Sequence, residues 1–178
     1  MAATFLTRAW AADVRDALNA GPDERALADK LPEYWDFYNL VRAVYESSWA
    51  LGARNLPAEL GGGERYLYVS WSGYFVTECR VLDTSEPVEA TYVLVADYTD
   101  WKALFSGYDA LRTVMYRKLL LEQGNLLEFF KSIYFFVESL ALIAKVPTEF
   151  PADRAVLGHP PDCAEWPVIA RKTGVGVR

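Results

Sequence analysis

The most apolar part of the chain spans residues 125–145, and its polar positions recur every three or four residues. These polar positions are Glu128, Lys131, Ser132, Glu138, Ser139 and Lys145. Such a period predicts one amphipathic helix of about 20 residues with a single solvent-facing stripe. Because Glu128, Lys131 and Glu138 interrupt it, the segment does not fit a membrane span. Its other face is broad and aromatic, which suits either ordinary core or the wall of a ligand site, and periodicity leaves both open.

Alternating apolar and polar residues predict a β-hairpin at residues 66–82, with its turn about Ser72 and Gly73. One face of the first arm carries Leu67, Val69 and Trp71. In the second arm we expect Phe75, Thr77, Cys79 and Val81 to face inward and Glu78 and Arg80 to face water. Further strands are predicted at residues 34–49, 90–96 and 117–123. The alternation at 34–49 is weak, so a helix is the alternative there.

Capping residues and a period of three to four predict several shorter helices. Two cover residues 5–19 and 23–30, the second capped by Asp23 and ended by Pro32. Two more follow the strand at 90–96: one capped by Thr99 that carries Trp101, Leu104 and Phe105, and one capped by Asp109 that carries Leu111, Val114 and Met115. Asn125 caps the long helix. Prolines at five positions after Lys145 predict a tail without regular structure.

The composition bounds the size and the partners of the protein. The chain has 178 residues, 52% hydrophobic and 15% aromatic, which fits one compact domain with a large core. We place this domain at residues 1–151, followed by a Pro-rich C-terminal tail at 152–178. The formal net charge is −6 and Lys and Arg do not cluster, so no nucleic-acid partner is expected. Arg8, Asp13 and Arg15 interrupt the N-terminal segment too early for a signal peptide, so we expect a cytoplasmic protein without stable membrane insertion.

Residues that usually carry catalysis or bind metals are few. The single histidine, His159, lies in the tail, and Cys79 and Cys163 are expected to be reduced thiols. The glycine run at residues 61–63 precedes a strand instead of opening a helix, so it is not a phosphate loop. No metal and no cofactor is therefore predicted. Glu138 is the best carboxylate for acid–base work in a cavity, but its place on the polar stripe favours a solvated helix face.

Three blocks of the sequence carry a resemblance to a known family. They are FLTRAWAADVRDALNAG, VADYTDWKALFSGYDALRTVMYRKLLLEQGNLLEFF and KVPTEFP, which together span roughly residues 5–151. These blocks resemble the bacterial branch of the sterol carrier protein family of lipid-binding domains. The chain keeps Asp97, Trp101, Gly107 and Gly124 in the expected order. It departs from the family at Arg117, which follows Tyr116 where a glycine usually precedes a lysine.

The resemblance implies a fold and a ligand class. The implied fold is α+β: a mostly antiparallel sheet of about five strands covered by helices, with an apolar tunnel between the sheet and the helices. The implied ligands are sterols, fatty acids, acyl-CoAs or phospholipids, held by apolar positions. The family offers no catalytic motif to transfer.

We therefore expect a non-catalytic module that binds and carries an apolar ligand such as a sterol, a fatty acid, an acyl-CoA or another lipid. The candidate wall residues are Trp71, Phe75, Trp101, Phe105, Leu111, Met115, Phe130, Ile133, Tyr134 and Val137. The alternative is a cofactor-free enzyme or accessory subunit, of the isomerase or cyclase type, acting on a lipid or polyketide-like substrate. A homodimer interface through Phe135 and Leu142 is compatible with carriage, and an enzyme is the other expected partner.

Overall fold

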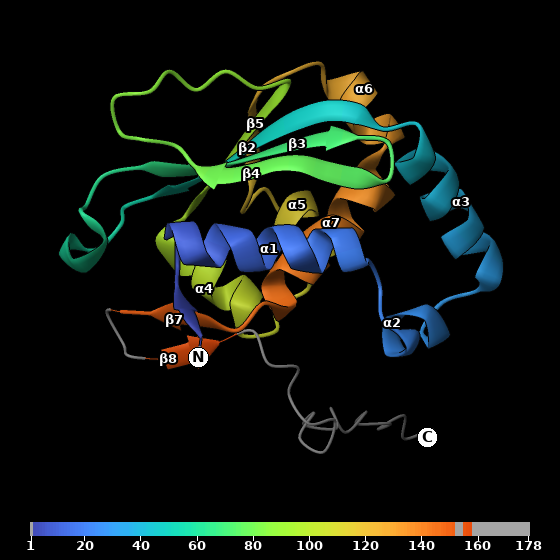
Figure 1. Cartoon of the computed structure of the whole chain (residues 1–178), viewed down its shortest axis with the longest axis horizontal. Coiled ribbons are helices and arrows are strands. Elements are labelled where there is room, and N and C mark those ends of the chain that lie inside the picture. The colour runs from blue at the N-terminus through green and yellow to red at the C-terminus, as the bar shows by residue number, and fades with distance from the viewer. Residues whose placement is uncertain (1, 152–154, 158–178) are drawn as a thin grey trace, which may run out of the picture.

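A computed structural model describes residues 2–151 and 155–157, and its largest element is a five-stranded sheet (Figure 1). In spatial order the strands are β4 (Phe75–Val81), β3 (Arg65–Ser72), β2 (Glu46–Arg54), β5 (Tyr92–Asp97) and β6 (Leu120–Gln123). The β2–β5 pair is parallel, whereas the other neighbours in this sheet are antiparallel. The predicted α+β fold with a mostly antiparallel sheet is therefore confirmed.

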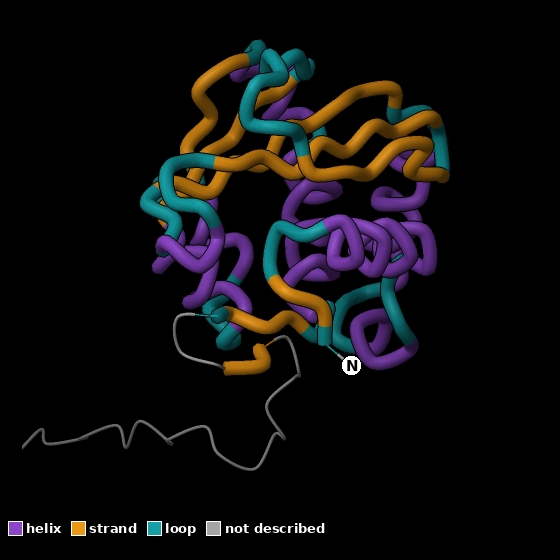
Figure 2. Tube along the Cα trace, turned by 60° about the vertical axis from the view of Figure 1, so that its left-hand side comes forward, coloured by secondary structure: helices purple, strands orange, loops and turns teal. Residues whose placement is uncertain are grey.

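The helices lie mainly on one face of this sheet. They are α1 (Arg8–Ala20), α2 (Glu24–Ala28), α3 (Pro32–Ala43), α4 (Tyr98–Phe105), α5 (Ala110–Met115), α6 (Leu126–Lys131) and α7 (Ile133–Lys145), with a short 3-10 turn, η1, at Ala58–Leu60. Figures 1 and 2 show α1, α4 and α7 as a layer beneath the strands, whereas α2 and α3 extend along one end of it.

Side-chain caps begin several of these helices where the sequence predicts them. Asp23 accepts the backbone N–H of Ala26 at 2.8 Å. Asp109 and Asn125 cap α5 and α6 in the same way. Each cap satisfies an N–H group that has no partner within its helix. The prediction for α4 is wrong by two residues, because Asp97 precedes the helix and Thr99 lies inside it.

Aromatic side chains fill the space between the sheet and the helical layer. Trp49 of β2, Trp71 of β3 and Phe135 of α7 are all buried. The two tryptophan rings are 5.4 Å apart, and the rings of Trp71 and Phe135 are 5.0 Å apart in an edge-to-face arrangement. Such pairs stabilise a core beyond the area that they bury. This part of the molecule is a packed core, and any ligand site has to lie elsewhere in the fold.

A second, three-stranded sheet joins the two ends of the described chain. It consists of β1 (Ala3–Thr4), β7 (Thr148–Phe150) and β8 (Ala155–Leu157), with β7 in the middle. The prediction of a tail without regular structure after Lys145 is therefore wrong at β7 and β8, because Pro147 and Pro151 lie just outside β7 and remove no N–H from it. The rest of the tail, with His159 and Cys163, lies outside the described residues.

The strand predicted at residues 34–49 is wrong, because its first part is helix α3 and only its end belongs to β2. Pro32 occupies the first turn of α3, where a missing N–H costs nothing and the fixed φ favours a helix. Trp35, Tyr38 and Arg42 then recur with helical spacing and are buried. Their aromatic composition suggests a strand, but their spacing specifies the helix.

The inward face of β4 differs from the prediction at Phe75 and Thr77, whereas Cys79 and Val81 pack against the core as expected. Val76 pairs with Trp71, whereas Glu78 pairs with Ser70, so Thr77 is an extra residue at a β-bulge. The bulge turns the side chains around it, and Val76 is buried while Phe75 is 64% exposed. Strands β5 and β6 form where they were predicted, although β6 is shorter than residues 117–123.

The single long helix predicted at residues 125–145 is two helices. Ser132 separates α6 from α7 with backbone angles of φ −110° and ψ 18°, and its hydroxyl donates to the carbonyl oxygen of Phe129. The polar stripe expected over this segment is wrong at three of its six positions, while Glu128, Lys131 and Lys145 are exposed as expected. Ser132, Glu138 and Ser139 are buried, whereas the apolar Leu127 is 75% exposed. The break lets the two halves of the segment face different surroundings.

Candidate ligand-binding site

A cavity of about 470 Å³ lies at the edge of the main sheet, between α5, β6 and α6. Its lining residues are Leu94, Val114, Met115, Arg117, Leu119, Leu120, Leu121, Leu126, Phe129 and Phe130. The volume falls within the range of about 300–1,000 Å³ that is typical of sites for small organic ligands. All but one of these described lining side chains are apolar.

Local sequence explains how the chain wraps around this space. Strand β6 has only four residues and pairs with β5 alone, so one of its edges stays uncovered within the sheet. Gly124 follows it with φ +123°, and a Cβ there would approach the carbonyl oxygen of Thr91 to 2.8 Å. A glycine is therefore needed at this turn. Asn125 then starts α6, which lies across the edge of the sheet instead of beneath it (Figure 1).

The cavity has a buried floor and an exposed rim. Leu94, Leu119 and Phe129 are buried and form the floor, whereas Met115 and Phe130 are 55% and 43% exposed. Two further apolar residues of the lining, Leu120 and Leu126, are 37% and 55% exposed. Exposed apolar side chains gathered around a hollow are typical of a binding surface. The cavity therefore opens to solvent through an apolar rim.

Arg117 is the one charged residue among the described residues of the lining. It follows Tyr116, the C-cap residue of α5, and has φ +58°, a conformation that glycine usually adopts at the end of a helix. Its backbone N–H donates to the carbonyl oxygen of Val114 at 3.1 Å. Within the described part of the chain, its guanidinium has no hydrogen-bond or ion-pair partner. A free cation thus lies beside an apolar hollow.

The structure brings two of the ten candidate wall residues, Met115 and Phe130, into this cavity. Trp71, Trp101, Phe105 and Val137 are buried in the core; Phe75, Leu111 and Tyr134 are exposed outside the lining; Ile133 is half-buried against the core. Sequence reasoning missed Leu94, Val114, Arg117, Leu119, Leu120, Leu121, Leu126 and Phe129. The run of leucines at 119–121 in a short strand was the available signal, because consecutive apolar residues in an edge strand cannot all face the core.

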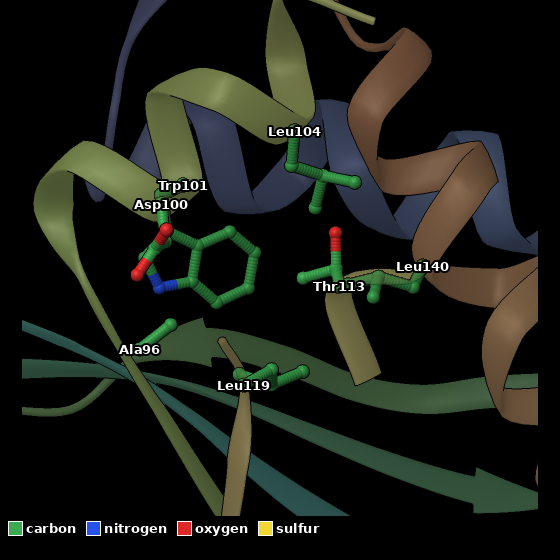
Figure 3. A pocket seen from close by; sticks show the side chains of 7 residues that line it. All are labelled: Ala96, Asp100, Trp101, Leu104, Thr113, Leu119 and Leu140. Carbon is green, nitrogen blue, oxygen red and sulfur yellow. The ribbon is translucent and has the colours of Figure 1, made fainter. Parts of the chain in front are cut away.

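Trp101 illustrates a candidate that belongs to the core. Its indole N–H donates to the carbonyl oxygen of Gly52 at 3.0 Å. Figure 3 shows its ring among the side chains of Ala96, Asp100, Leu104, Thr113, Leu119 and Leu140. The space between these side chains has no room for a water molecule. Trp101 therefore fixes α4 against β2.

The structure also corrects the expectation that Glu138 lies on a solvated helix face. This carboxylate is buried, accepts a hydrogen bond from the Tyr34 hydroxyl at 2.6 Å and forms an ion pair with the Lys30 ammonium. Burial, followed by the hydrogen bond to Glu138, raises the pKa of Tyr34 well above its ordinary value. Glu138 is absent from the cavity lining. Glu138 joins α7 to Tyr34 of α3 and to Lys30, which precedes α3. We name these three residues the Glu138 clasp.

Two further expectations can be compared with the described residues. Phe135 and Leu142 were considered for a homodimer interface, but both are buried in the core of their own chain. These two side chains therefore cannot form that interface. No cluster of three or more His, Cys, Asp or Glu side chains is placed to hold a metal ion within residues 2–151 and 155–157. Over the same residues, no helix is long and apolar enough to cross a membrane.

No protein-family model and no curated protein matches the chain. Its fold is similar to the crystal structure of sterol carrier protein 2, with a TM-score of 0.62 and 19% identity over 80% of this chain and 98% of that chain. It is also similar to the solution structure of a conserved hypothetical protein of Thermus thermophilus, named as a candidate sterol carrier protein. There the TM-score is 0.61, with 18% identity over 83% of this chain and 96% of that chain. At such identities the likeness concerns the fold, and the chain has the fold of sterol carrier protein 2.

Proposed function

We propose that this protein binds and carries a lipid in the cavity between α5, β6 and α6, without changing it chemically. The observation that carries the proposal is the hollow of about 470 Å³ with an apolar lining and an exposed apolar rim. An apolar chain that enters it loses contact with water, which favours binding by about 25 cal/mol per Å² of apolar surface. Lipid binding also fits the fold, because one structure of the same fold is a sterol carrier protein.

The lining favours carriage over catalysis. Among its described residues only Arg117 is ionisable, and a guanidinium stays protonated in proteins and cannot act as a base. The best buried carboxylate, Glu138, is engaged by Lys30 and Tyr34 outside the lining. Within residues 2–151 and 155–157 no acid–base pair therefore lines the cavity, and binding is the function that these walls support. The proposal includes a cytoplasmic location and transfer of the ligand to an enzyme partner.

Filling the cavity tests this proposal. Val114→Trp places a large ring from α5 into the lining, whereas Leu111→Trp adds the same ring on α5 outside it. Native mass spectrometry of the purified proteins, followed by extraction and identification of the small molecules, should find a lipid with the wild type and with Leu111→Trp. Val114→Trp should be empty while its melting temperature stays close to that of the wild type.

Two results would contradict carriage in this cavity. One is a wild-type protein that is empty and also fails to bind fluorescent fatty acids. The other is a folded Val114→Trp variant that retains as much lipid as the wild type, because the ligand would then lie elsewhere.

A further inference from the structure

We propose that Arg117 selects ligands with an anionic head, a carboxylate or a phosphate, over neutral lipids with the same chain. This inference rests on the proposed function and deepens it. Apolar pockets use a small number of polar groups to orient their ligands. Here a single cation lines a hollow whose other described walls are apolar. The arrangement matches an amphiphile with one charged end and one apolar end.

The basic residues near the cavity differ in their availability. Arg54 binds Glu122 of β6 through two contacts of 2.7 Å. Lys118 lies 2.6 Å from Asp100. A carboxylate that already neutralises a cation weakens its attraction for a second anion. These two side chains are therefore poor anchors for a ligand.

A third basic residue near the rim is also paired with a carboxylate. Lys131 of α6 lies 2.6 Å from Glu128. Arg117 has no such partner among the described residues, although its five N–H donors suit a carboxylate or phosphate in a forked geometry. The guanidinium of Arg117 is thus the available anion-binding group of the lining.

The charge of the surrounding segment supports the same ligand class. Residues 110–131 contain four basic residues and two acidic ones, a net charge of +2, in a chain with a net charge of −6. The basic residues are Arg112, Arg117, Lys118 and Lys131, and the acidic ones are Glu122 and Glu128. Asp100 and Glu128 offset Lys118 and Lys131, and Arg54 offsets Glu122, so the positive charge left in this segment is that of Arg112 and Arg117. A positive charge at the rim attracts anions to it. The ligand head would meet Arg117 while its chain reaches the floor at Phe129.

The backbone at Arg117 adds a further observation. Arg117 has a left-handed backbone conformation, which is unfavourable for a non-glycine residue, and it follows directly on the C-cap of α5. Glycine would fit there without this cost. An arginine held in such a conformation is consistent with a role in binding, because strained backbone is concentrated at functional sites.

Matched ligands and matched variants test the inference. The ligands are palmitic acid, hexadecyl phosphate and hexadecanol, which share one chain and differ in the head. The variants are Arg117→Gln, Arg117→Lys and, as a control, Arg112→Gln, which removes the same charge from an α5 residue outside the lining. Dissociation constants would be measured by displacement of a neutral fluorescent probe, and thermal melting would confirm that each variant is folded.

We expect Arg117→Gln to weaken binding of the acid and of the phosphate by about tenfold and to leave hexadecanol unchanged. Arg117→Lys keeps the charge but loses the forked geometry, so it should restore only part of the affinity. Arg112→Gln should alter the affinity by less than about twofold. Added salt should weaken anion binding to the wild type more than to Arg117→Gln. The head that binds more tightly identifies the anion as carboxylate or phosphate.

Failure of this inference differs from failure of carriage. Equal binding of hexadecanol and both anions by the wild type, or equal losses with Arg112→Gln and Arg117→Gln, would overturn the role of Arg117 while carriage stands. Absence of binding for all three ligands would instead reject the proposed function and this inference with it.

Discussion

Helices α6 and α7 adjoin in the sequence and are both rich in apolar residues, yet they have different surroundings. In α7, Phe135, Phe136 and Ile143 are buried under the main sheet. In α6, Leu126 and Phe130 line the cavity and are 55% and 43% exposed. The interruption at Ser132 allows this difference, because a continuous helix would present its apolar residues along one line. Similar composition therefore serves stability in one helix and an open binding surface in the other.

The largest effect is expected from removing an aromatic side chain of α7. Phe135 is buried among the rings of Tyr38, Tyr45, Trp49 and Trp71, with centroids 4.7–5.9 Å away. Phe135→Ala should lower the free energy of unfolding by about 3–5 kcal/mol, because it leaves a cavity in a packed core. Urea denaturation followed by tryptophan fluorescence would measure this change. A loss below about 1 kcal/mol would show that α7 is not the core helix of the pair.

A smaller effect, on binding instead of folding, is expected from α6. Phe130→Asp places a charge in the cavity lining, where the ring is 43% exposed. It should weaken binding of a fluorescent fatty acid by about thirtyfold, or about 2 kcal/mol, because the carboxylate would lose water and repel an anionic ligand. The free energy of unfolding should fall by less than about 1 kcal/mol.

Leu127→Asp is the matched control for Phe130→Asp. Leu127 lies on the same helix, is 75% exposed and is absent from the lining. Its substitution should leave binding within about twofold of the wild type. If both variants lost binding equally, the apolar surface of α6 as a whole, and not the cavity, would be responsible.

The contrast between α6 and α7 also shows how far the sequence can be interpreted. The hairpin and the caps at Asp109 and Asn125 could be predicted, because each depends on neighbouring residues. The broad apolar face of residues 125–145 was predicted too, but which part of it packs depends on the break at Ser132. Only the tertiary structure decides that.

The cavity could be predicted only in part for the same reason. Met115 and Phe130 were proposed from their helical spacing, which places them on apolar faces. Leu120 and Leu121 were not proposed. The leucine run shows that some of these side chains lie outside the core, but the place of a strand in the sheet depends on the tertiary structure. Arg117 was noted as a departure from the family pattern, but its lack of an ionic partner among the described residues became visible only in three dimensions.

The smallest effects on stability are expected from replacing one carboxylate on each helix. Glu138 of α7 is buried and accepts from Tyr34, whereas Glu128 of α6 is exposed and pairs with Lys131 at 2.6 Å. Glu138→Gln should lower the free energy of unfolding by about 1–1.5 kcal/mol. The substitution weakens a partly buried hydrogen bond and removes the charge that faces Lys30. The ion pair itself contributes little of this, because the Lys30 side chain is 40% exposed.

Glu128→Gln should cost less than about 0.5 kcal/mol, as is usual for an exposed pair on a helix. Both variants should bind a fluorescent fatty acid with wild-type affinity, because neither carboxylate lines the cavity. Urea denaturation and ligand titration of the two proteins measure these quantities side by side. If Glu138→Gln lost ligand affinity without losing stability, the Glu138 clasp would belong to the binding site, and the division between a structural α7 and a binding α6 would fail.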